Sequence, residues 1–400
     1  MALTATAATA KISVQVHRNL EIAKQSNIVV KFYCDEALTT HHRRLKGGAK
    51  ASRTETIESL VNSLKEHTTT SQASVKSLLA NQVESTAVAV ATTWIQCSMY
   101  INNAPTDLVH KFAALPEVKS IYEAVMMELS QTKSDDKPAS AANDIKGEGI
   151  VVANIDTGVH HIHESLESNW RREYGWFNPY NKTNQLPSDT DGHSTHAKWI
   201  ACKGCEDRMV VQCDHFLLCP HDKDGNNCDS SKAPHVINDS FGEHRTDNVK
   251  RSGNHSRVCE WQQRLKGCAY SSYPAACPQV ITVGSTNSGD FLAFDSSLGP
   301  SVRKRGKPDI SAPGVSIHSA VHFSDNGFIR ESGTSMAAPH VSGAIALYLS
   351  ANNGASYDQA YAALTENVDT DTLYPPNKTC GGITNTKYPN KLFGFGRLNI

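Results

Sequence analysis

The sequence lacks any apolar run long enough to cross a membrane, since no stretch reaches the roughly 18 apolar residues that a transmembrane helix requires. It also lacks an excess of charge of either sign, because 39 Lys and Arg residues stand against 40 Asp and Glu residues. That balance argues against the strongly basic surface of nucleic-acid-binding proteins and against an acidic tail. Residues 1–10 have no basic segment followed by an apolar one, so no signal peptide is visible. We expect no nucleic-acid partner and no membrane partner.

Cysteine is scarce in the first half of the chain and dense afterwards, because nine of the 11 cysteines follow residue 200. Such density favours disulfides and an oxidising compartment. A zinc site around Cys202 and Cys205, with Cys213 and Cys219 as further ligands, is an alternative, although the second pair is spaced more widely than zinc sites prefer. A Cys/His metal-binding module therefore remains one hypothesis.

Residues 11–130 carry no cluster of chemically active side chains but a clear alternation of predicted elements. Strands are predicted over 27–33, 91–101 and 118–129, and helices over 52–64, 75–79 and 108–115. The first helix begins with a capping box formed by Ser52 and Glu55. The order β-α-α-β-α-β indicates a small α/β sandwich that could fold alone. Residues 131–147 are polar, contain Pro138 and read as a linker before a second domain over residues 148–400.

The second domain opens with an apolar run over residues 149–155 that ends in Asp156. This pattern predicts a buried strand that delivers a carboxylate at its carboxyl end, where functional groups gather in open α/β sheets. An aspartate that caps the following turn is the alternative interpretation.

A second candidate position is Ser335, within residues 333–340 (GTSMAAPH) at the start of an Ala-rich apolar run. We predict a buried helix with Pro339 in its first turn, where a proline is tolerated. Ser335 would then lie at the positive end of the helix dipole, which suits a hydroxyl that attacks a carbonyl. Alternatively, Thr334 or Ser335 is an ordinary N-cap.

A third motif, residues 191–196 (DGHSTH), completes the order Asp156, His193, Ser335, with spacings of 37 and 142 residues. No G-x-S-x-G motif surrounds Ser335, so the sequence does not match the α/β-hydrolases. The chain resembles the subtilisin-like serine proteases, which share this order. Further matching segments are residues 153–159 (ANIDTGV), 236–242 (VINDSFG), 273–278 (YPAACP), 307–314 (KPDISAPG) and 393–399 (FGFGRLN).

The resemblance implies an α/β fold, a subtilisin-like three-layer α/β/α domain with a mainly parallel sheet. Residues 198–205 (KWIACKGC) resemble the secreted bacillopeptidase-F-like branch of the family. Residues 11–130 resemble that branch's inhibitory propeptide, a small α+β (ferredoxin-like) domain that also assists folding. The linker over 131–147 would then hold the maturation site.

The resemblance also implies roles for single residues. Ser335 would be the nucleophile, His193 the general base and acid, and Asp156 the group that orients the imidazole. The reaction would be hydrolysis of peptide bonds in proteins through an acyl-enzyme. The residues expected to bind substrate are Ser240, Phe241, Gly242, Gly333 and Thr334. We expect an extracellular, monomeric zymogen that is inhibited by its own propeptide. It should need no cofactor and hold no catalytic metal. Structural calcium is possible, but no ligand set can be assigned.

The chain departs from the family pattern at three places. The segment after His193 is short, so a helix that holds the imidazole would be reduced and the base displaced. No apolar strand is evident between Gly242 and Tyr273, which removes a central strand and one wall of the specificity pocket. The expected asparagine of the oxyanion hole is missing as well, which leaves the Ser335 backbone N–H and, as a candidate, Asn254. A catalytically impaired homologue that acts as a binding scaffold is therefore the alternative function.

Overall fold

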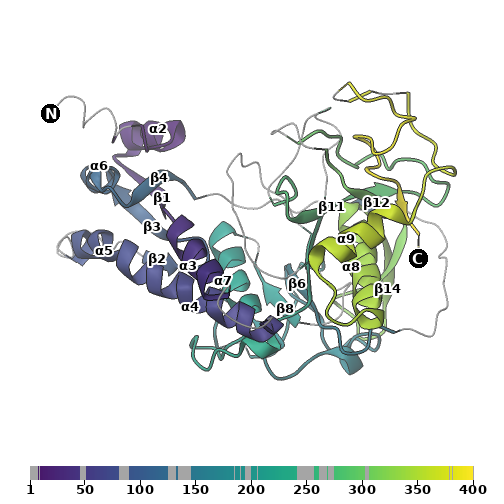
Figure 1. Cartoon of the computed structure of the whole chain (residues 1–400), viewed down its shortest axis with the longest axis horizontal. Helices are drawn as coiled ribbons and strands as arrows, with labels where there is room; N and C mark the ends of the chain where they lie inside the picture. The colour runs from purple at the N-terminus through teal and green to yellow at the C-terminus, as the bar shows by residue number, and fades with distance from the viewer. Residues whose placement is uncertain are drawn as a thin grey trace. The chain divides into compact units, whose positions relative to one another are not determined.

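The computed structural model describes most of the chain, namely residues 8, 10–45, 51–80, 90–124, 132–133, 146–183, 185–189, 191–193, 200–204, 206–240, 256–260, 268, 274–301, 306–377, 379–380 and 382–399. These residues form two compact units. The first comprises Met1–Met126 together with Glu206–Cys219, and the second holds nearly all of the rest. Figure 1 shows the elements of both units.

The first unit is a four-stranded antiparallel sheet with helices. Its elements in chain order are α2 (Val14–Ala23), β1 (Gln25–Phe32), α3 (Asp35–Leu45), α4 (Arg53–Ser71), α5 (Ala73–Ala80), β2 (Val90–Thr93), β3 (Ser98–Pro105), α6 (Thr106–Ala114) and β4 (Val118–Glu123). The strand order is β2-β3-β1-β4. The predicted capping box is confirmed: Ser52 Oγ accepts from the Glu55 N–H at 3.2 Å, and a Glu55 carboxylate oxygen accepts from the Ser52 N–H at 2.7 Å.

One strand prediction for this unit is wrong, and another is confirmed in part. The apolar run over 91–101 is not one strand but the two strands β2 and β3, joined by a turn at Trp94 to Cys97. The turn is closed by Cys97, whose φ is +46° and which donates its N–H to the Trp94 carbonyl. The strand predicted over 118–129 is confirmed as β4 for Val118–Glu123, and residues 125–129 lie outside the described range.

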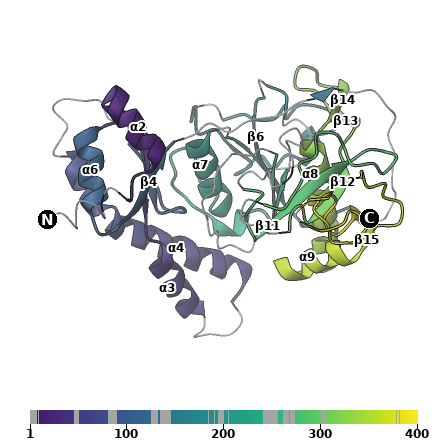
Figure 2. The same cartoon turned by 90° about the horizontal axis from the view of Figure 1, so that it is seen from above.

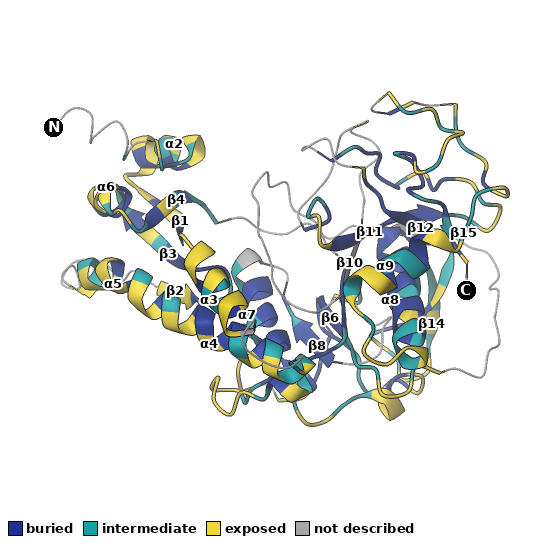
Figure 3. Cartoon of the chain, in the orientation of Figure 1, coloured by how far each residue is buried: buried dark blue, intermediate teal, exposed yellow. Residues whose placement is uncertain are grey.

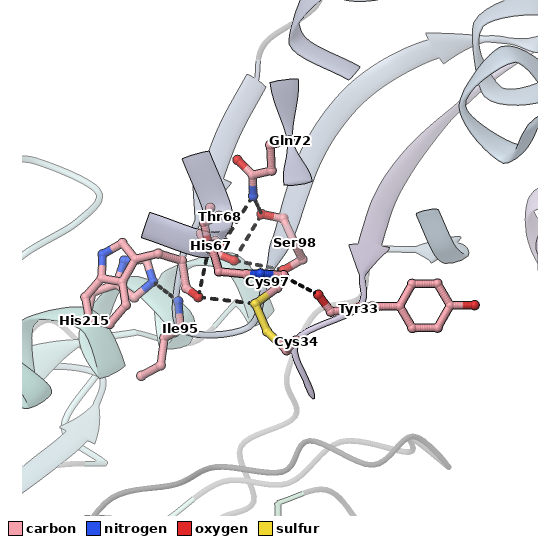
Figure 4. Close-up of a disulfide and its surroundings, with 11 residues drawn as sticks. Tyr33, Cys34, His67, Thr68, Gln72, Ile95, Cys97, Ser98 and His215 are labelled. Atoms are coloured by element: carbon pink, nitrogen blue, oxygen red, sulfur yellow. Dashed lines mark hydrogen bonds between the residues drawn. A yellow bond between two sulfur atoms is a disulfide. The ribbon is translucent and has the colours of Figure 1, made fainter. Parts of the chain in front are cut away.

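The turn between β2 and β3 is fixed from two sides (Figure 4). A disulfide joins Cys97 to Cys34, just after β1. On the other side lies α7 (Asp207–Leu218), whose His215 imidazole stacks on the Trp94 indole with the ring centroids 4.4 Å apart. The Ile95 N–H donates to His215 Nε2 at 3.3 Å. Helix α7 therefore contacts the N-terminal sandwich directly, although it begins 84 residues after Glu123, the last residue of β4.

The second unit is built on a nine-stranded, mainly parallel sheet. Its strands are β6 (Val152–Asp156), β7 (Trp176–Phe177), β8 (Ile200–Lys203), β9 (Val236–Asp239), β10 (Ser256–Glu260), β11 (Val280–Thr286), β12 (Ile310–Pro313), β15 (Val368–Asp369) and β16 (Arg397–Leu398). The order is β15-β16-β12-β11-β10-β9-β6-β8-β7, and only β15 pairs antiparallel. Two short 3-10 helices, Glu167–Asn169 and Ser230–Lys232, lie in the connections. The predicted α/β class with a mainly parallel sheet is confirmed.

The sequence analysis is wrong about the segment between Gly242 and Tyr273. It predicts that a central strand is missing there, but β10 pairs in parallel with both β9 and β11 and so fills that position. The apolar signal is weak because β10 reads Ser-Arg-Val-Cys-Glu, with charged residues at two of its positions. Parallel pairing on both sides places the strand in the sheet despite this composition.

Helix α8 (Thr334–Ala351) covers strands β9 to β12, and α9 (Tyr357–Glu366) packs beside it (Figures 1 and 2). The buried residues of α8 include Ala337, Val341 and Ile345, which pack in one hydrophobic cluster with Ile281 and Ile310 of the sheet. Figure 3 shows β11 and β12 in the dark blue of buried residues. A separate small sheet pairs β13 (Ile317–Ala320), β14 (Phe328–Ser332) and β5 (Thr132–Lys133). None of the described helices has the length and apolar character that a membrane span requires.

Candidate active site

Strand β6 places Asp156 at its carboxyl end, as predicted. It pairs in parallel with β8 on one side and with β9 on the other. The strands that follow β6 in the chain are therefore added first on one side of it and then on the other, which makes this position a topological switch point. Ligands bind at such switch points, outside the carboxyl ends of the strands. Asp156 is 2% exposed, and its Oδ1 accepts the N–H of the next residue, Thr157, at 2.7 Å.

Helix α8 places Ser335 as its second residue, which confirms that this serine lies at the helix start. Pro339, however, is the sixth residue of the helix and so lies in the second turn rather than the first. A proline at this position has no N–H for the carbonyl four residues earlier, which is that of Ser335. Instead, the Ser240 hydroxyl donates to the Ser335 carbonyl at 3.3 Å.

His193 brings these two positions together. Its Nδ1 lies 2.9 Å and 3.0 Å from the two carboxylate oxygens of Asp156, and its Nε2 lies 3.0 Å from Ser335 Oγ. The residue is 2% exposed and Ser335 is 4% exposed. Because an ionised carboxylate only accepts hydrogen bonds, this arrangement places the imidazole proton on Nδ1 and leaves Nε2 as the acceptor of the serine hydroxyl. The base displacement expected from the short segment after His193 is not found, and residues 194–199 themselves lie outside the described range.

A buried polar network behind this trio was not singled out by the sequence analysis. Asn238 on β9 donates from Nδ2 to Asn154 Oδ1 at 2.9 Å and to Ser240 Oγ at 3.0 Å. Its Oδ1 accepts from Ser342 Oγ of α8 at 3.1 Å. Two asparagines at paired positions in otherwise apolar strands are the signal that could have revealed the network. It ties the strands that carry Asp156 and Ser240 to the helix that carries Ser335.

The other residues predicted to bind substrate are placed only in part. Ser240 is buried, 3% exposed, with its hydroxyl in the network. Gly333 precedes α8 and donates its N–H to the Gly314 carbonyl at 2.7 Å. The Thr334 hydroxyl is buried and has no hydrogen-bond partner among the described residues. Phe241, Gly242 and the oxyanion candidate Asn254 lie outside the described range.

The zinc alternative is wrong for the cysteines that the structure describes. Cys202, Cys213, Cys219 and Cys228 are all disulfide-bonded, and a further disulfide joins Cys268 to Cys380. Zinc binds cysteine as a thiolate, so oxidised cysteines cannot serve as its ligands. Within the described ranges, no group of three or more His, Cys, Asp or Glu side chains has a geometry suited to a metal ion.

A buried ion pair, Lys307 with Asp309, lies directly before strand β12. Lys307 is 3% exposed and pairs with Asp309, and it also donates to the Val280 carbonyl at 2.7 Å. Asp309 accepts further hydrogen bonds from the Thr282 N–H at 2.7 Å and from the Tyr361 hydroxyl at 3.0 Å. Burial, together with the negative charge of Asp309, raises the pKa of Tyr361 above its ordinary value. The pair thus links the segment before β12 to β11 and to α9, which fits a structural role.

Comparisons with known proteins agree with this geometry. The model of the subtilase family (Peptidase_S8) matches residues 226–396, which include Ser335. Bacillopeptidase F of Bacillus subtilis (strain 168) is 29% identical over 328 residues, covering 66% of this chain and 21% of the relative. Alkaline serine exoprotease A of Vibrio alginolyticus is 29% identical over 260 residues, covering 60% of this chain and 46% of the relative.

A third relative is the extracellular serine proteinase of Thermus sp. (strain Rt41A), which is 30% identical over 240 residues, covering 54% of this chain and 55% of the relative. The chain thus spans between about a fifth and about half of the length of these relatives. The sequence motifs, the mainly parallel sheet and these matches agree on one family with a three-layer α/β/α fold. The chain is therefore similar to the subtilase family of serine proteases, whose model matches residues 226–396.

Proposed function

We propose that this chain is a serine endopeptidase that hydrolyses peptide bonds with Asp156, His193 and Ser335. The observation that carries the proposal is the position of His193, whose two ring nitrogens lie within 3.0 Å of Asp156 and Ser335. The three side chains are almost fully buried, so their electrostatic interactions act in a medium of low dielectric constant.

In the first step, Ser335 Oγ attacks the carbonyl carbon of the substrate while its proton passes to His193 Nε2. Asp156 stabilises the imidazolium that forms and holds Nδ1 as the protonated nitrogen. The negative charge that develops on the carbonyl oxygen is favoured by the N–H of Ser335, in the first turn of α8 at the positive end of the helix dipole. His193 then gives its proton to the leaving amine, and water hydrolyses the acyl-enzyme by the same path in reverse.

The chain is proposed to be made as a zymogen, with the N-terminal sandwich as its inhibitor. Two observations support this part of the proposal. Helix α7, which follows strand β8 of the proposed catalytic domain, contacts the sandwich through His215. The short strand β5 pairs antiparallel with β14, with Thr132 opposite Ser332, three residues before the proposed nucleophile. An extended segment that adds to a strand is a common mode of peptide recognition.

An extracellular site of action is part of the proposal. The disulfides within the described residues fit an oxidising compartment. One relative is named an extracellular serine proteinase, which adds an argument from similarity. Proteins would be the substrates, and a monomer is the proposed state.

The proposal is tested by producing the chain in a secretory host with an added signal peptide, beside the Ser335→Ala variant. Self-processing needs a single turnover, so it detects even weak activity. The proposal predicts that the wild type loses a fragment of the mass of the N-terminal domain while Ser335→Ala stays at 43.5 kDa. If both proteins stay intact and folded, the function is that of a non-catalytic binding scaffold instead.

A further inference from the structure

We propose that Asp189 is a positioning residue that holds His193 against Asp156, and that Thr157 links the two acids. The inference rests on the proposed function only for its kinetic readout. Neither Asp189 nor Thr157 touches the position where substrate would react; both act through the residues beside them.

A single oxygen of Asp189 receives three hydrogen bonds. Its Oδ1 accepts from the Gly192 N–H at 2.8 Å, from the Asp191 N–H at 3.0 Å and from the Thr157 hydroxyl at 3.0 Å. The first two bonds tie Asp191 and Gly192 back to the Asp189 side chain and so form a side-chain-closed turn immediately before His193. Asp189 is only 8% exposed, so these charge-assisted bonds are little weakened by water.

Thr157 joins this turn to the other acid. Its main-chain N–H donates to Asp156 Oδ1 at 2.7 Å, while its hydroxyl donates to Asp189 Oδ1. The residue is 3% exposed. One residue is therefore bonded both to the carboxylate that faces the imidazole and to the carboxylate that shapes the turn carrying that imidazole.

Two glycines allow the segments to approach this closely. A Cβ on Gly158 would lie 2.0 Å from the Ser188 carbonyl oxygen, so any larger residue would push the turn away from β6. Gly192 has a φ of +96°, and a Cβ there would lie 2.2 Å from His322 Nδ1. The turn is thus packed against β6 on one side and against His322 on the other, with Asp189 at its centre.

The inference explains how His193 keeps its geometry although the segment that follows it is short. The residues that precede His193 fix the distance from its Nδ1 to Asp156, because Asp189 holds the turn before His193 and Thr157 bonds to both Asp189 and Asp156. A displacement of about 1 Å between catalytic groups can cost about a hundredfold in rate.

The first test measures peptide hydrolysis, per active site counted by burst titration, for Asp189→Ala, Asp189→Asn and Thr157→Val. The inference predicts that kcat falls about a hundredfold in Asp189→Ala and about tenfold in Thr157→Val, with KM changed less than about twofold. Asp189→Asn keeps an oxygen that can accept the same bonds, so it should stay within about threefold of the wild type. Asp191→Ala, which removes the exposed neighbouring acid, is the matched control and should retain full activity.

The second test does not depend on activity. In a Ser335→Ala background, NMR observes the proton that His193 Nδ1 shares with Asp156, which resonates far downfield when that bond is short and protected. We predict that Asp189→Ala and Thr157→Val weaken or broaden this signal, whereas Asp189→Asn and Asp191→Ala keep it. If the signal is unchanged in a folded Asp189→Ala protein, the inference is wrong, whether or not the protein is a protease. If the predicted NMR changes are seen but the wild type has no peptidase activity, only the proposed function is wrong.

Discussion

The Ser240 hydroxyl, directly after strand β9, donates a hydrogen bond of 3.3 Å to the main-chain carbonyl of Ser335 in the first turn of α8. A regular helix would satisfy this carbonyl with the N–H of residue 339, but that residue is Pro339. A side chain from β9's end thus replaces a missing helical donor next to the proposed nucleophile. Asn238 in turn donates to Ser240 Oγ, which orients the hydroxyl proton toward the carbonyl.

This relationship predicts a coupling between Ser240 and Pro339. Ser240→Ala should lower the free energy of unfolding by about 1–3 kcal/mol, because it leaves a buried carbonyl without this donor. In a Pro339→Ala background, residue 339 regains an N–H and the cost of Ser240→Ala should shrink. Urea unfolding of the four proteins, all carrying Ser335→Ala to prevent self-digestion, gives the coupling energy. Equal costs in the two backgrounds would show that Pro339 and Ser240 are independent.

The pairing of β5 with β14 predicts where processing occurs. The strands pair antiparallel, with Thr132 opposite Ser332, and β14 leads directly into the segment that carries Ser335. We expect the mature chain to begin at Thr132 or within about three residues before it, as determined by N-terminal sequencing of the processed protein. A mature terminus after Lys133, deeper in the polar linker, would contradict this assignment; Ser335→Ala serves as the unprocessed control.

How much of this site could be read from the sequence depends on the kind of signal. Asp156, His193 and Ser335 were identified because each lies in a short motif and the three recur in one order. Asp189 and Thr157 were missed because their importance comes from one hydrogen bond across 32 residues of sequence. Linear spacing does not reveal such a contact.

The same distinction holds for the fold. The helix after Ser52 was predicted because its apolar residues recur at helical spacing behind a capping box. Helix α3 was missed because its Thr, His and Arg residues show no apolar period. Strand β10 was missed because its place depends on pairing with β9 and β11 rather than on its own composition.

Stability should fall in mild acid. Burial lowers the pKa of His161 and of His340 below the ordinary value of 6.5. The unfolded chain therefore binds protons at these residues at a higher pH than the folded protein does, so stability is fully present above about pH 6.5 and is lost as the pH falls toward the lower folded pKa. The Tm of the Ser335→Ala protein should decrease between about pH 7.5 and pH 5.5.

His340→Gln is the variant that assigns part of this effect. In the wild type, His340 Nδ1 donates to the Met336 carbonyl at 2.8 Å, and a glutamine amide can also donate there. The variant should show a smaller loss of Tm over the same pH interval. Identical pH slopes for the two proteins would exclude His340 as a contributor.

The buried pair Lys307–Asp309 should be sensitive to the loss of one partner. Lys307→Met leaves the Asp309 carboxylate buried without its cation, and we expect a cost of about 3–5 kcal/mol in the free energy of unfolding. The double variant Lys307→Met/Asp309→Asn removes both charges and should recover part of that loss. Urea unfolding in the Ser335→Ala background measures both; a cost below about 1 kcal/mol for Lys307→Met would mean that the pair is solvated rather than buried.

The most direct test of the central claim is to label the processed protein with a fluorophosphonate, which reacts only with an activated serine, and to locate the adduct by peptide mapping. The proposed mechanism predicts one label per molecule on Ser335, strongly reduced labelling in His193→Ala and none in Ser335→Ala. A folded, processed wild-type protein that takes up no label, or takes it up on another serine, would contradict the assignment of Ser335 as the nucleophile.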